Sequence, residues 1–542
     1  MDARNGRAQL LLLLITSTIG MAGMSTVAAE RGKSEWVYAG PNGKLVYKTT
    51  PVGDRIMDFS HAGYMGGGVA LPTVPVKRTL QPSGGDDDSA VIQAVINEVA
   101  AMSLANGFRG AVLLGPGTFS CSNTITIPAS GVVLRGSGSG DQAGKHTTIK
   151  LTGKPHLAIA IRAPGSGRRR GTDDSQPATN GAVGSQEFKP AETTIADAYV
   201  PSGAMAFTVS DATGFVAGDT IEIRRPVTET WIKFMEMHNL VRDGRPQTWI
   251  RTGNTTITER KIAAISGKKI TLEVPLSDSF DSKYLNPPGT SVVKIRPPTR
   301  ISQAGIEHLR IESPPQAINH TQSHFTALRV SGEDCWVRDV ICEETMNSVG
   351  VSGRRITLER VAVNRRAAHQ GSSKPAEFAP NAGQVLLDRC SAIGDNVWYS
   401  ATGGGQAGPI VLLNCTFRGN GRVESHQRWT TGVLYDNCRA TGGGIDFRNR
   451  GAMGSGHGWT MGWGVAWNCE AESFVIQNPP GSANWMIGCI GQSRPMPRPF
   501  DKEPNLAGGT MDSHGTPVTP QSLYLTQLAE RLGPQAVKNI GY

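Results

Sequence analysis

The sequence predicts an all-β protein whose short strands stack in repeated coils. The 542-residue chain contains 66 Gly and 33 Pro residues, which interrupt regular elements, and its apolar runs are short stretches of Val, Ile and Leu. Charged residues make up 18% and apolar residues 38% of the chain, a composition that excludes a coiled coil and a disordered chain. Repetition allows a β architecture of this kind to exceed the size of one ordinary core.

Five cysteines in the C-terminal half each follow a short apolar run, namely Cys390, Cys415, Cys438, Cys469 and Cys489. The average interval between consecutive cysteines is roughly 25 residues, a period typical of one coil of a parallel β-helix. We therefore expect the cysteines to stack as an internal file, one per coil and roughly 4.8 Å apart.

Three of these cysteines directly follow an asparagine, at Asn414, Asn437 and Asn468. Asparagine tolerates unusual backbone angles, and stacked side-chain amides can hydrogen-bond from coil to coil. We expect the stacked thiols to be free, because parallel coils need no covalent link, and we regard Cys335 and Cys342 as the better disulfide candidates. No cysteine spacing typical of a zinc site is present.

Residues 1–29 have the pattern of an export signal. Arg4 and Arg7 precede an apolar run from Leu10 to Ile19, and the small residues Val27 to Ala29 offer a cleavage site. No second apolar stretch of ~20 residues follows. The sequence therefore predicts a secreted or periplasmic protein with no transmembrane segment.

Residues 30–163 are expected to hold the first coils and a capping helix. An acidic turn, Asp86 to Ser89, precedes a segment with Val91, Val95 and Val99 at helical spacing. Gly107 is a plausible end for this helix. Short apolar runs separated by glycine turns then predict the first strands.

The middle of the chain predicts an insertion. Residues 164–192 are polar and low in complexity, which predicts a flexible loop; its Arg168–Arg170 run either contacts an anion or is solvated. Residues 193–297 again predict strands and form an inserted β-rich module. Its aromatic residues Trp231, Phe234 and Trp249, with Arg251, either fill the core of the module or reach over a sugar-binding groove.

Residues 298–493 form the main coils, and residues 494–542 form a C-terminal tail with one expected helix, Pro520–Leu532. The formal net charge of +9 fits acidic polysaccharide, nucleic acid or anionic membrane, or serves solubility alone. No nucleic-acid-binding motif is present, so we expect no nucleic-acid partner.

Two neighbouring long turns carry the strongest candidate site. The Cys438–Cys469 coil is longer than the coils on either side of it, and its excess contains Arg448, Arg450, His457 and Trp459. The preceding coil contributes Glu424, His426, Arg428 and Trp429. Since adjacent coils place equivalent turns side by side, we expect His426 and His457 to lie close together.

This set of residues suits an acidic sugar. Arginine binds a carboxylate through paired hydrogen bonds, an indole gives a flat face for a pyranose ring, and histidine transfers protons near neutral pH. The catalytic candidates are His426, His457, Arg428, Arg448 and Arg450. The substrate-binding candidates are Glu424, Trp429, Trp459, His369 and Lys374, the last two in a turn one coil earlier. Each of these also has a structural alternative, in surface solvation or in packing of the turns.

Several segments resemble those of the pectate-lyase-like right-handed parallel β-helix superfamily. The N-terminal match runs from Asp58 to Gly138 and includes the Gly85–Ser89 turn, GAVLLGPGTF and ITIPASGVVLRGSG, and the late match covers positions 424–489. The resemblance implies a right-handed parallel β-helix that acts on polysaccharides, with Arg or Ca²⁺ neutralising a substrate carboxylate. The aspartate motifs of polygalacturonases, and the acidic Ca²⁺ cluster and arginine motif of many pectate lyases, are not found here.

We therefore expect an exported enzyme that cleaves a uronate-containing polysaccharide by β-elimination, with Ca²⁺ a possible cofactor. The alternative within the same class is a glycoside hydrolase, for which Asp395, Asp436 and Asp446 are the available late carboxyls; a structural role is expected for Asp436. The alternative outside the class is a carbohydrate-binding or adhesion protein without catalysis.

Overall fold

The computed structural model describes residues 31–542 except 141, 143, 166–188, 317–321, 368, 370, 372, 501–505 and 507. The expected export signal (1–29) and most of the expected flexible loop, including Arg168 to Arg170, lie outside the described residues. Within the described part of the chain, no helix is long and apolar enough to cross a membrane.

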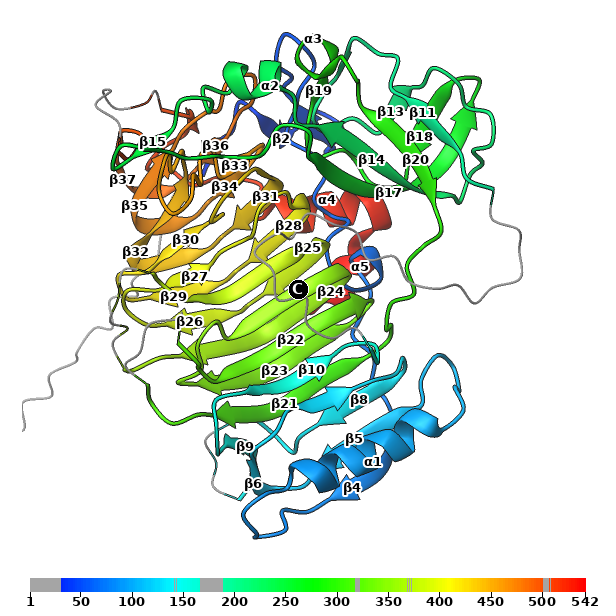
Figure 1. Ribbon diagram of the computed structural model, residues 1–542, viewed down its shortest axis with the longest axis vertical. Helices are drawn as coiled ribbons and strands as arrows, with labels where there is room; N and C mark the ends of the chain where they lie inside the picture. The colour runs from blue at the N-terminus through cyan, green and yellow to red at the C-terminus, as the bar shows by residue number, and fades with distance from the viewer. Residues whose placement is uncertain are drawn as a thin grey trace, which may run out of the picture. The chain divides into compact units, whose positions relative to one another are not determined.

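Most strands belong to one large parallel sheet that winds through successive coils (Figure 1). Each coil contributes up to three strand segments, and equivalent segments pair in parallel to form three ladders. The first ladder contains β4 (Val76–Leu80), β5 (Gly110–Leu114), β8 (Val132–Arg135), parts of β21 (Gly305–Glu312), β23 (Trp336–Glu343), β24 (Val349–Asn364) and β25 (Ala376–Asp388), then β28 (Ala407–Leu413), β31 (Thr430–Asp436), β34 (Val465–Trp467), β36 (Trp485–Ile487) and β38 (Thr510–Asp512).

The other two ladders complete the coils. The second contains β6 (Gly117–Cys121), β9 (Thr147–Leu151), the ends of β21, β23 and β24, β26 (Ser391–Ile393), β29 (Thr416–Arg418), the starts of β32 (Arg439–Phe447) and β35 (Glu470–Ile476), and β37 (Ile490–Ser493). The third contains β7 (Ile125–Ile127), β10 (Leu157–Ile161), β22 (Thr326–Glu333), the starts of β24 and β25, β27 (Trp398–Ser400), β30 (Arg422–Glu424) and the ends of β32 and β35. A short strand, β33 (Met461–Gly462), pairs with β31.

Side chains along these strands point alternately into and out of the coils, and the inward-pointing side chains form the core. In β28, Ile410 and Leu412 are buried inside the coils, and Val433 and Tyr435 of β31 occupy the equivalent positions one coil later. Each such side chain contributes about 1.5–3 kcal/mol when fully buried. The stacked core therefore repeats with the coil, as expected for a parallel β-helix.

One left-handed residue turns the chain from the first ladder to the second in eight successive coils, with φ between 49° and 65°. These residues are His308, Asp339, Arg360, Arg389, Asn414, Asn437, Asn468 and Gly488. The expected ladder of asparagine amides does not form: Asn414 Nδ2 donates to the Tyr542 hydroxyl and Asn468 Nδ2 to the Val518 carbonyl. The asparagines recur because their backbone adopts this conformation at modest cost.

The cysteine file is confirmed. Each of the five thiols follows the left-handed residue and donates to a backbone carbonyl of the preceding coil; Cys415, for example, donates to Leu387 at 3.4 Å and Cys469 to Tyr435 at 3.2 Å. All eight cysteines are buried and free. The disulfide expected between Cys335 and Cys342 was therefore wrong, because both thiols lie in the coil core as reduced side chains.

Helix α1 (Ser89–Ala101) lies beside β4 at one end of the coil stack (Figure 1) and packs on β5, β7 and β8. Ile92, Ile96 and Val99 form its buried face, whereas Val91 is exposed. The acidic turn before the helix binds both the helix and β6: Asp87 Oδ1 accepts from the Ser89 backbone N–H at 3.0 Å, and Asp88 Oδ2 accepts from the Ser120 backbone N–H at 3.0 Å. The helix ends at Ala101, earlier than Gly107.

The inserted module is a six-stranded antiparallel sheet in the order β11-β20-β14-β17-β18-β13. Its elements are β11 (Glu192–Thr194), β12 (Tyr199–Val200), β13 (Ala206–Thr208), β14 (Thr220–Pro226), α2 (Glu229–Phe234), β15 (Val241–Arg242), β16 (Arg245–Pro246), β17 (Thr255–Ser266), β18 (Lys269–Leu272), β19 (Phe280–Asp281), α3 (Ser282–Leu285) and β20 (Ser291–Ile295). The module leaves the coils after β10 of the third ladder and returns at β21 of the first ladder.

The two ends of the described chain pack against the outer face of the first ladder. The N-terminal segment contains β1 (Gly32–Lys33), β2 (Val37–Ala39), β3 (Leu45–Tyr47) and the 3-10 turn Tyr64–Gly66; the C-terminal segment contains β39 (Val518–Thr519), α4 (Leu523–Leu532) and α5 (Pro534–Asn539). Helix α4 begins later than expected because Ser522 caps it, and Gly533, at φ 83°, separates it from a second helix that the sequence analysis did not predict.

Asp436 has the structural role expected of it. Its Oδ2 accepts from the Ser522 hydroxyl at 2.7 Å and from the Tyr524 backbone N–H at 2.8 Å. This carboxyl is fully buried, and burial raises its pKa to about 7. Asp436 therefore holds the start of α4 on the first ladder and is removed from the hydrolase candidates.

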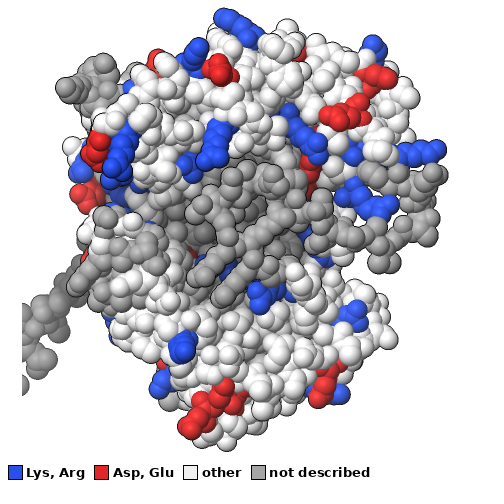
Figure 2. Space-filling view, in the orientation of Figure 1, with Lys and Arg blue, Asp and Glu red and all other residues white. Residues whose placement is uncertain are grey.

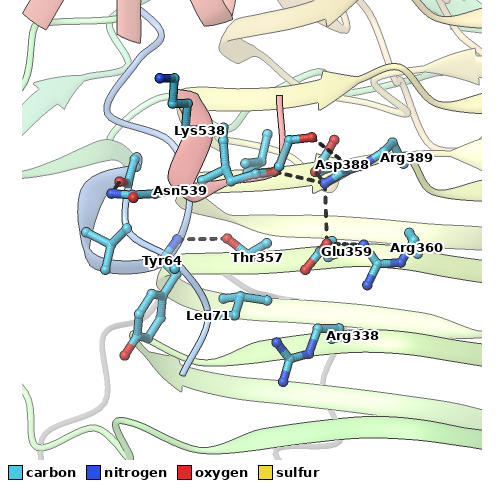
Figure 3. A pocket seen from close by; sticks show the side chains of 17 residues that line it. Tyr64, Leu71, Arg338, Thr357, Glu359, Arg360, Asp388, Arg389, Lys538 and Asn539 are labelled. Carbon is cyan, nitrogen blue, oxygen red and sulfur yellow. Dashed lines mark hydrogen bonds and ion pairs between the residues drawn. The ribbon is translucent and has the colours of Figure 1, made fainter. Parts of the chain in front are cut away.

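A cavity of about 240 Å³ lies between the N-terminal segment, the first ladder and α5 (Figure 3). Its charged groups pair with one another: Arg389 Nη2 contacts Glu359 at 3.3 Å and Asp388 at 2.5 Å, and Thr357 accepts from the Tyr64 backbone N–H. These contacts join three distant segments of the chain.

Candidate functional site

The two histidine turns and the inserted module occupy the same flank of the coils. The turn with His426 runs from β30 of the third ladder to β31 of the first, and the turn with His457 runs from β32 to β34 in the same way. The module fills the equivalent connection between β10 and β21. Beyond this flank the strands pair again in parallel, with local register shifts such as the one between Ala407 and Ile410.

The imidazole rings of His426 and His457 lie 4.7 Å apart between centroids, with an angle of 58° between their planes. The backbone N–H of Arg428 donates to the carbonyl of His457 at 3.0 Å and holds the two turns together. The juxtaposition expected from the stacking of the coils is present.

Arg450 joins both histidine turns to a buried acid. Its Nη1 lies 2.9 Å from the His426 carbonyl oxygen, 3.0 Å from His426 Nδ1 and 3.2 Å from Glu424 Oε1. Because a guanidinium only donates hydrogen bonds, His426 Nδ1 is the acceptor, and a neutral His426 carries its proton on Nε2.

Glu424 lies beneath this cluster with a fully buried side chain. Its Oε2 is 3.6 Å from Arg448 Nε, and burial raises its pKa although Arg450 and Arg448 oppose the rise. A buried carboxyl cannot reach a substrate, so the substrate-binding role expected for Glu424 is replaced by the positioning of two arginines.

Apart from the ion pair of its Nε with Glu424 at 3.6 Å, the Arg448 side chain has no oxygen partner among the described residues. Its Nη1 and Nη2 donate to the sulfur atoms of Met496 and Met453 at 3.3 and 3.6 Å, and its Nε has no hydrogen bond among the described residues. Thioether sulfur is a weak acceptor. A carboxylate would therefore satisfy this guanidinium better than the protein does.

His457 is held in its neutral form. Burial, followed by the charges of Arg450, Arg428 and Arg242, lowers its pKa to about 3. Its Nδ1 is buried without a hydrogen-bond partner among the described residues. At neutral pH the ring is thus an uncharged imidazole, the form that accepts a proton.

Trp398 completes the cluster, and the sequence analysis missed it. His426 meets its ring edge-on at 5.6 Å, the Arg450 guanidinium carbon lies 4.9 Å from its centroid, and Lys374 Nζ lies at 5.2 Å. Burial lowers the pKa of Lys374, and nearby arginines add to this. The coil period could have predicted this position, because it places Trp398 next to Arg422, on the neighbouring strand of the preceding coil.

A second missed residue, Arg422, lies on the same outer face of the third ladder. It binds both carboxylate oxygens of Asp446 and donates to the Ser473 hydroxyl at 2.9 Å. Asp446 stands in register with Glu424 on the neighbouring strand. The spacing of the rungs predicts this alignment once the strands are assigned.

Three other candidates have structural roles. Arg428 donates from Nε to the Trp249 carbonyl at 2.7 Å and from Nη2 to Ser455, so it is engaged away from the histidines. Trp429 and Trp459 are 3% and 4% exposed and pack in the core of the inserted module. Their burial contradicts the expectation that they stack a sugar at the histidine site.

His369 is buried, and its Nε2 lies 2.9 Å from the Ser373 carbonyl oxygen within its own turn. Of the pair expected one coil earlier, only Lys374 reaches the cluster around Trp398. Among the described residues, no group of three or more His, Cys, Asp or Glu side chains is arranged to hold a metal ion.

Positive charge is widespread on the described surface. On the face seen in Figure 2, Lys and Arg side chains lie on both the coil stack and the inserted module. Around Trp398, four cations (Lys374, Arg422, Arg448 and Arg450) accompany the two carboxyls Glu424 and Asp446. This surplus of cations favours an anionic ligand at the cluster.

Comparisons with known proteins give no family. No protein-family model and no curated protein matches the chain. Among solved structures, it is similar to the tailspike protein gp49 of Pseudomonas phage LKA1, with 14% identity and a TM-score of 0.36 over 75% of this chain and 64% of that chain. It is also similar to the gp54 tailspike of Acinetobacter baumannii bacteriophage AP22 in complex with capsular saccharide, with 10% identity and a TM-score of 0.35 over 76% and 61%.

A third similar structure is the A-module of the mannuronan C-5 epimerase AlgE4 of Azotobacter vinelandii, with 10% identity and a TM-score of 0.29 over 77% of this chain and 88% of that chain. The chain spans less than two thirds of the length of either tailspike. Scores at this level support no argument about activity, and the site must be interpreted from its own residues.

Proposed function

We propose that this protein is a secreted polysaccharide lyase that cleaves a uronate-containing polymer by β-elimination at the His426–His457 cluster. The proposal rests on one observation: two histidines in contact share a neighbourhood with an arginine, Arg448, whose two Nη atoms donate only to methionine sulfur among the described residues. As part of the same proposal, the coils wind right-handed and α1 caps them.

Arg448, with Arg450 beside it, binds the substrate carboxylate. Neutralising that carboxylate makes the proton on C5 more acidic, which is the difficult step of β-elimination. Neutral His457 takes the C5 proton, and His426 donates its Nε2 proton to the leaving glycosidic oxygen. The products are a chain with a 4,5-double bond in its terminal uronate and a chain with a free hydroxyl.

Substrate binding also strengthens the base. The arginine charges contribute to the low pKa of His457, and a bound carboxylate offsets them. The pKa of His457 therefore rises when the anionic sugar is bound, toward the range in which general bases work well. Lys374, whose pKa is lowered, is the alternative base.

The test is incubation with a panel of uronate polymers while the ultraviolet absorbance of the unsaturated product is followed. Replacing His457 by Gln should lower kcat by about 10²–10⁴-fold, and Arg448→Ala should raise KM and lower kcat. The exposed residues His514 and Arg418 provide matched controls in His514→Gln and Arg418→Ala. Full activity of both site variants would contradict the assignment.

A glycoside hydrolase is the alternative within the same class, and Asp395 and Asp446 remain its carboxyl candidates now that Asp436 is removed. New reducing ends without ultraviolet absorbance would identify it. Full activity after replacement of each of the two by Asn would exclude it. A polymer that is retained on the protein but never shortened would instead identify a binding protein.

A further inference from the structure

A second cavity, of about 440 Å³, lies where the inserted module meets the coils. Residues of β14, α2, β19 and α3 line it, together with the turns that carry Trp429 and Gly481. Its volume falls within the range of small-molecule sites, roughly 300–1,000 Å³. It does not include the two histidines.

Aromatic rings line this cavity at two depths. Trp231 and Trp429 are buried and meet edge-to-face at 5.7 Å between centroids. Phe234 and Tyr284 are only partly buried and stack at 3.9 Å, 15° from parallel, so they stand nearer the opening. Gly481 packs so tightly on Phe234 that a Cβ atom would lie 2.9 Å from its ring. The walls are therefore largely aromatic, and a pyranose ring can pack against them.

Arg225 lines the same cavity and is 5% exposed. Its guanidinium carbon lies 3.9 Å from the centroid of Trp231, and its Nε lies 3.7 Å from Asp278 Oδ2, beyond hydrogen-bond distance. Neither Nε nor Nη1 has a hydrogen-bond partner among the described residues. Buried donors of this kind are costly unless an acceptor reaches them.

Asp278 does not accept a hydrogen bond from these donors of Arg225. This carboxylate already accepts from the indole N–H of Trp429 at 2.9 Å and from that of Trp463 at 3.3 Å. The hydroxyl oxygen of Ser482, which also lines the cavity, is likewise buried without a hydrogen-bond partner among the described residues. The lining of this aromatic cavity thus contains two polar side chains with buried hydrogen-bonding atoms that lack partners.

We infer that this cavity binds one pyranose unit of a glycan, at a site separate from the histidine cluster. The ring stacks on the aromatic walls, and its oxygen atoms accept from Arg225 and Ser482. Arg225 and Lys283 are balanced by Asp278 and Asp281 around the cavity, so the site recognises the hydroxylated ring rather than net charge. This inference does not require cleavage at the histidine cluster.

The test uses the full chain and tryptophan fluorescence, because Trp231 and Trp429 line the cavity. The probes are galacturonate, glucuronate, galactose and glucose, with benzoate and inorganic phosphate as ligands that offer only a ring or only an anion. We expect a saturable fluorescence change, and protection from acrylamide quenching, with at least one pyranose and with neither benzoate nor phosphate.

Phe234→Ala removes one wall and should weaken sugar binding about tenfold, while the same substitution at the exposed Phe500 should leave it unchanged. Ser482→Ala, which preserves the fold even if Phe234→Ala does not, should weaken binding severalfold. His457→Gln should leave monosaccharide binding unchanged, which separates this site from the proposed lyase site. Absence of saturable pyranose binding, binding of benzoate or phosphate alone, or equal binding by Phe234→Ala and Ser482→Ala with the wild type would overturn the inference.

Discussion

Arg428 donates from Nε to the backbone carbonyl of Trp249 at 2.7 Å, and this bond joins a histidine turn of the coils to the inserted module. Two further bonds extend the connection: Trp249 Nε1 donates to the Trp459 carbonyl at 3.1 Å, and Trp459 Nε1 donates to the Met235 carbonyl at 3.0 Å. The module therefore supports both turns that carry the candidate histidines.

Loss of this connection should affect stability and the site together. We expect Arg428→Leu to lower the free energy of unfolding by about 1.5–3 kcal/mol, the usual range for hydrogen bonds from a charged donor, and to lower kcat on a polymer substrate. Arg439→Leu, which removes an exposed arginine paired with Glu470, is the matched control. Denaturant unfolding and initial rates measure both effects; equal behaviour of the two variants would argue against the support role.

The cysteine file should be chemically silent. All eight thiols are buried and free, so a reagent in solvent cannot reach them in the folded protein. A disulfide reagent that titrates thiolates should therefore label none in the native protein and all eight after denaturation without reductant. Fewer than eight labelled thiols in the denatured protein would reveal a disulfide.

Stability should depend on the ionisation of Asp436. Its folded pKa of about 7 is above the ordinary value of 3.8, so the folded state binds the proton more tightly than the unfolded state. The contribution to stability is complete below about pH 4 and is lost as the pH rises through about 7, by at most about 4 kcal/mol.

Asp436→Asn keeps an oxygen acceptor for α4 and removes the titration. We expect the midpoint of thermal unfolding of the wild type to fall relative to this variant between about pH 4 and pH 7. Asp395→Asn, at an exposed position, should follow the wild type throughout. Parallel curves for wild type and Asp436→Asn would show that Asp436 does not titrate in this range.

The stability of the protein should depend on the residue at position 437, because Asn437 adopts the left-handed conformation with φ 52°. Asn437→Val places a β-branched residue in this conformation and should cost about 1–2 kcal/mol more than Asn437→Gly. Chemical denaturation of the pair provides the comparison. A valine variant as stable as the glycine variant would mean that the turn can change its backbone conformation.

The coils could be predicted because their signal is local and periodic. Cys390 and the four later thiols each lie two residues after the end of a strand of the first ladder, and stacking the coils brings these equivalent positions together. The same regularity predicted the approach of His426 to His457, since both turns join the third ladder to the first.

The burial of the aromatic candidates could not be predicted in this way. Trp429 and Trp459 are covered by Trp231, Trp249 and Met235, which belong to the inserted module and lie far earlier in the chain. The spacing of the coils does not predict which turns of the coils an inserted module packs against. For the same reason, Glu424 resembled an exposed rim charge, although its side chain lies under two arginines.

The placement of the module has a consequence for how such a chain can diversify. The flank between the third and first ladders accommodates both an entire six-stranded module and the long histidine turns, and the strands on either side of it still pair in parallel. The turns and the module at this flank can thus be exchanged while the core of the coils stays the same. Grafting the turns between β30 and β34 onto a coil stack of the same register would transfer the histidine pair, but only if the supporting module travels with them.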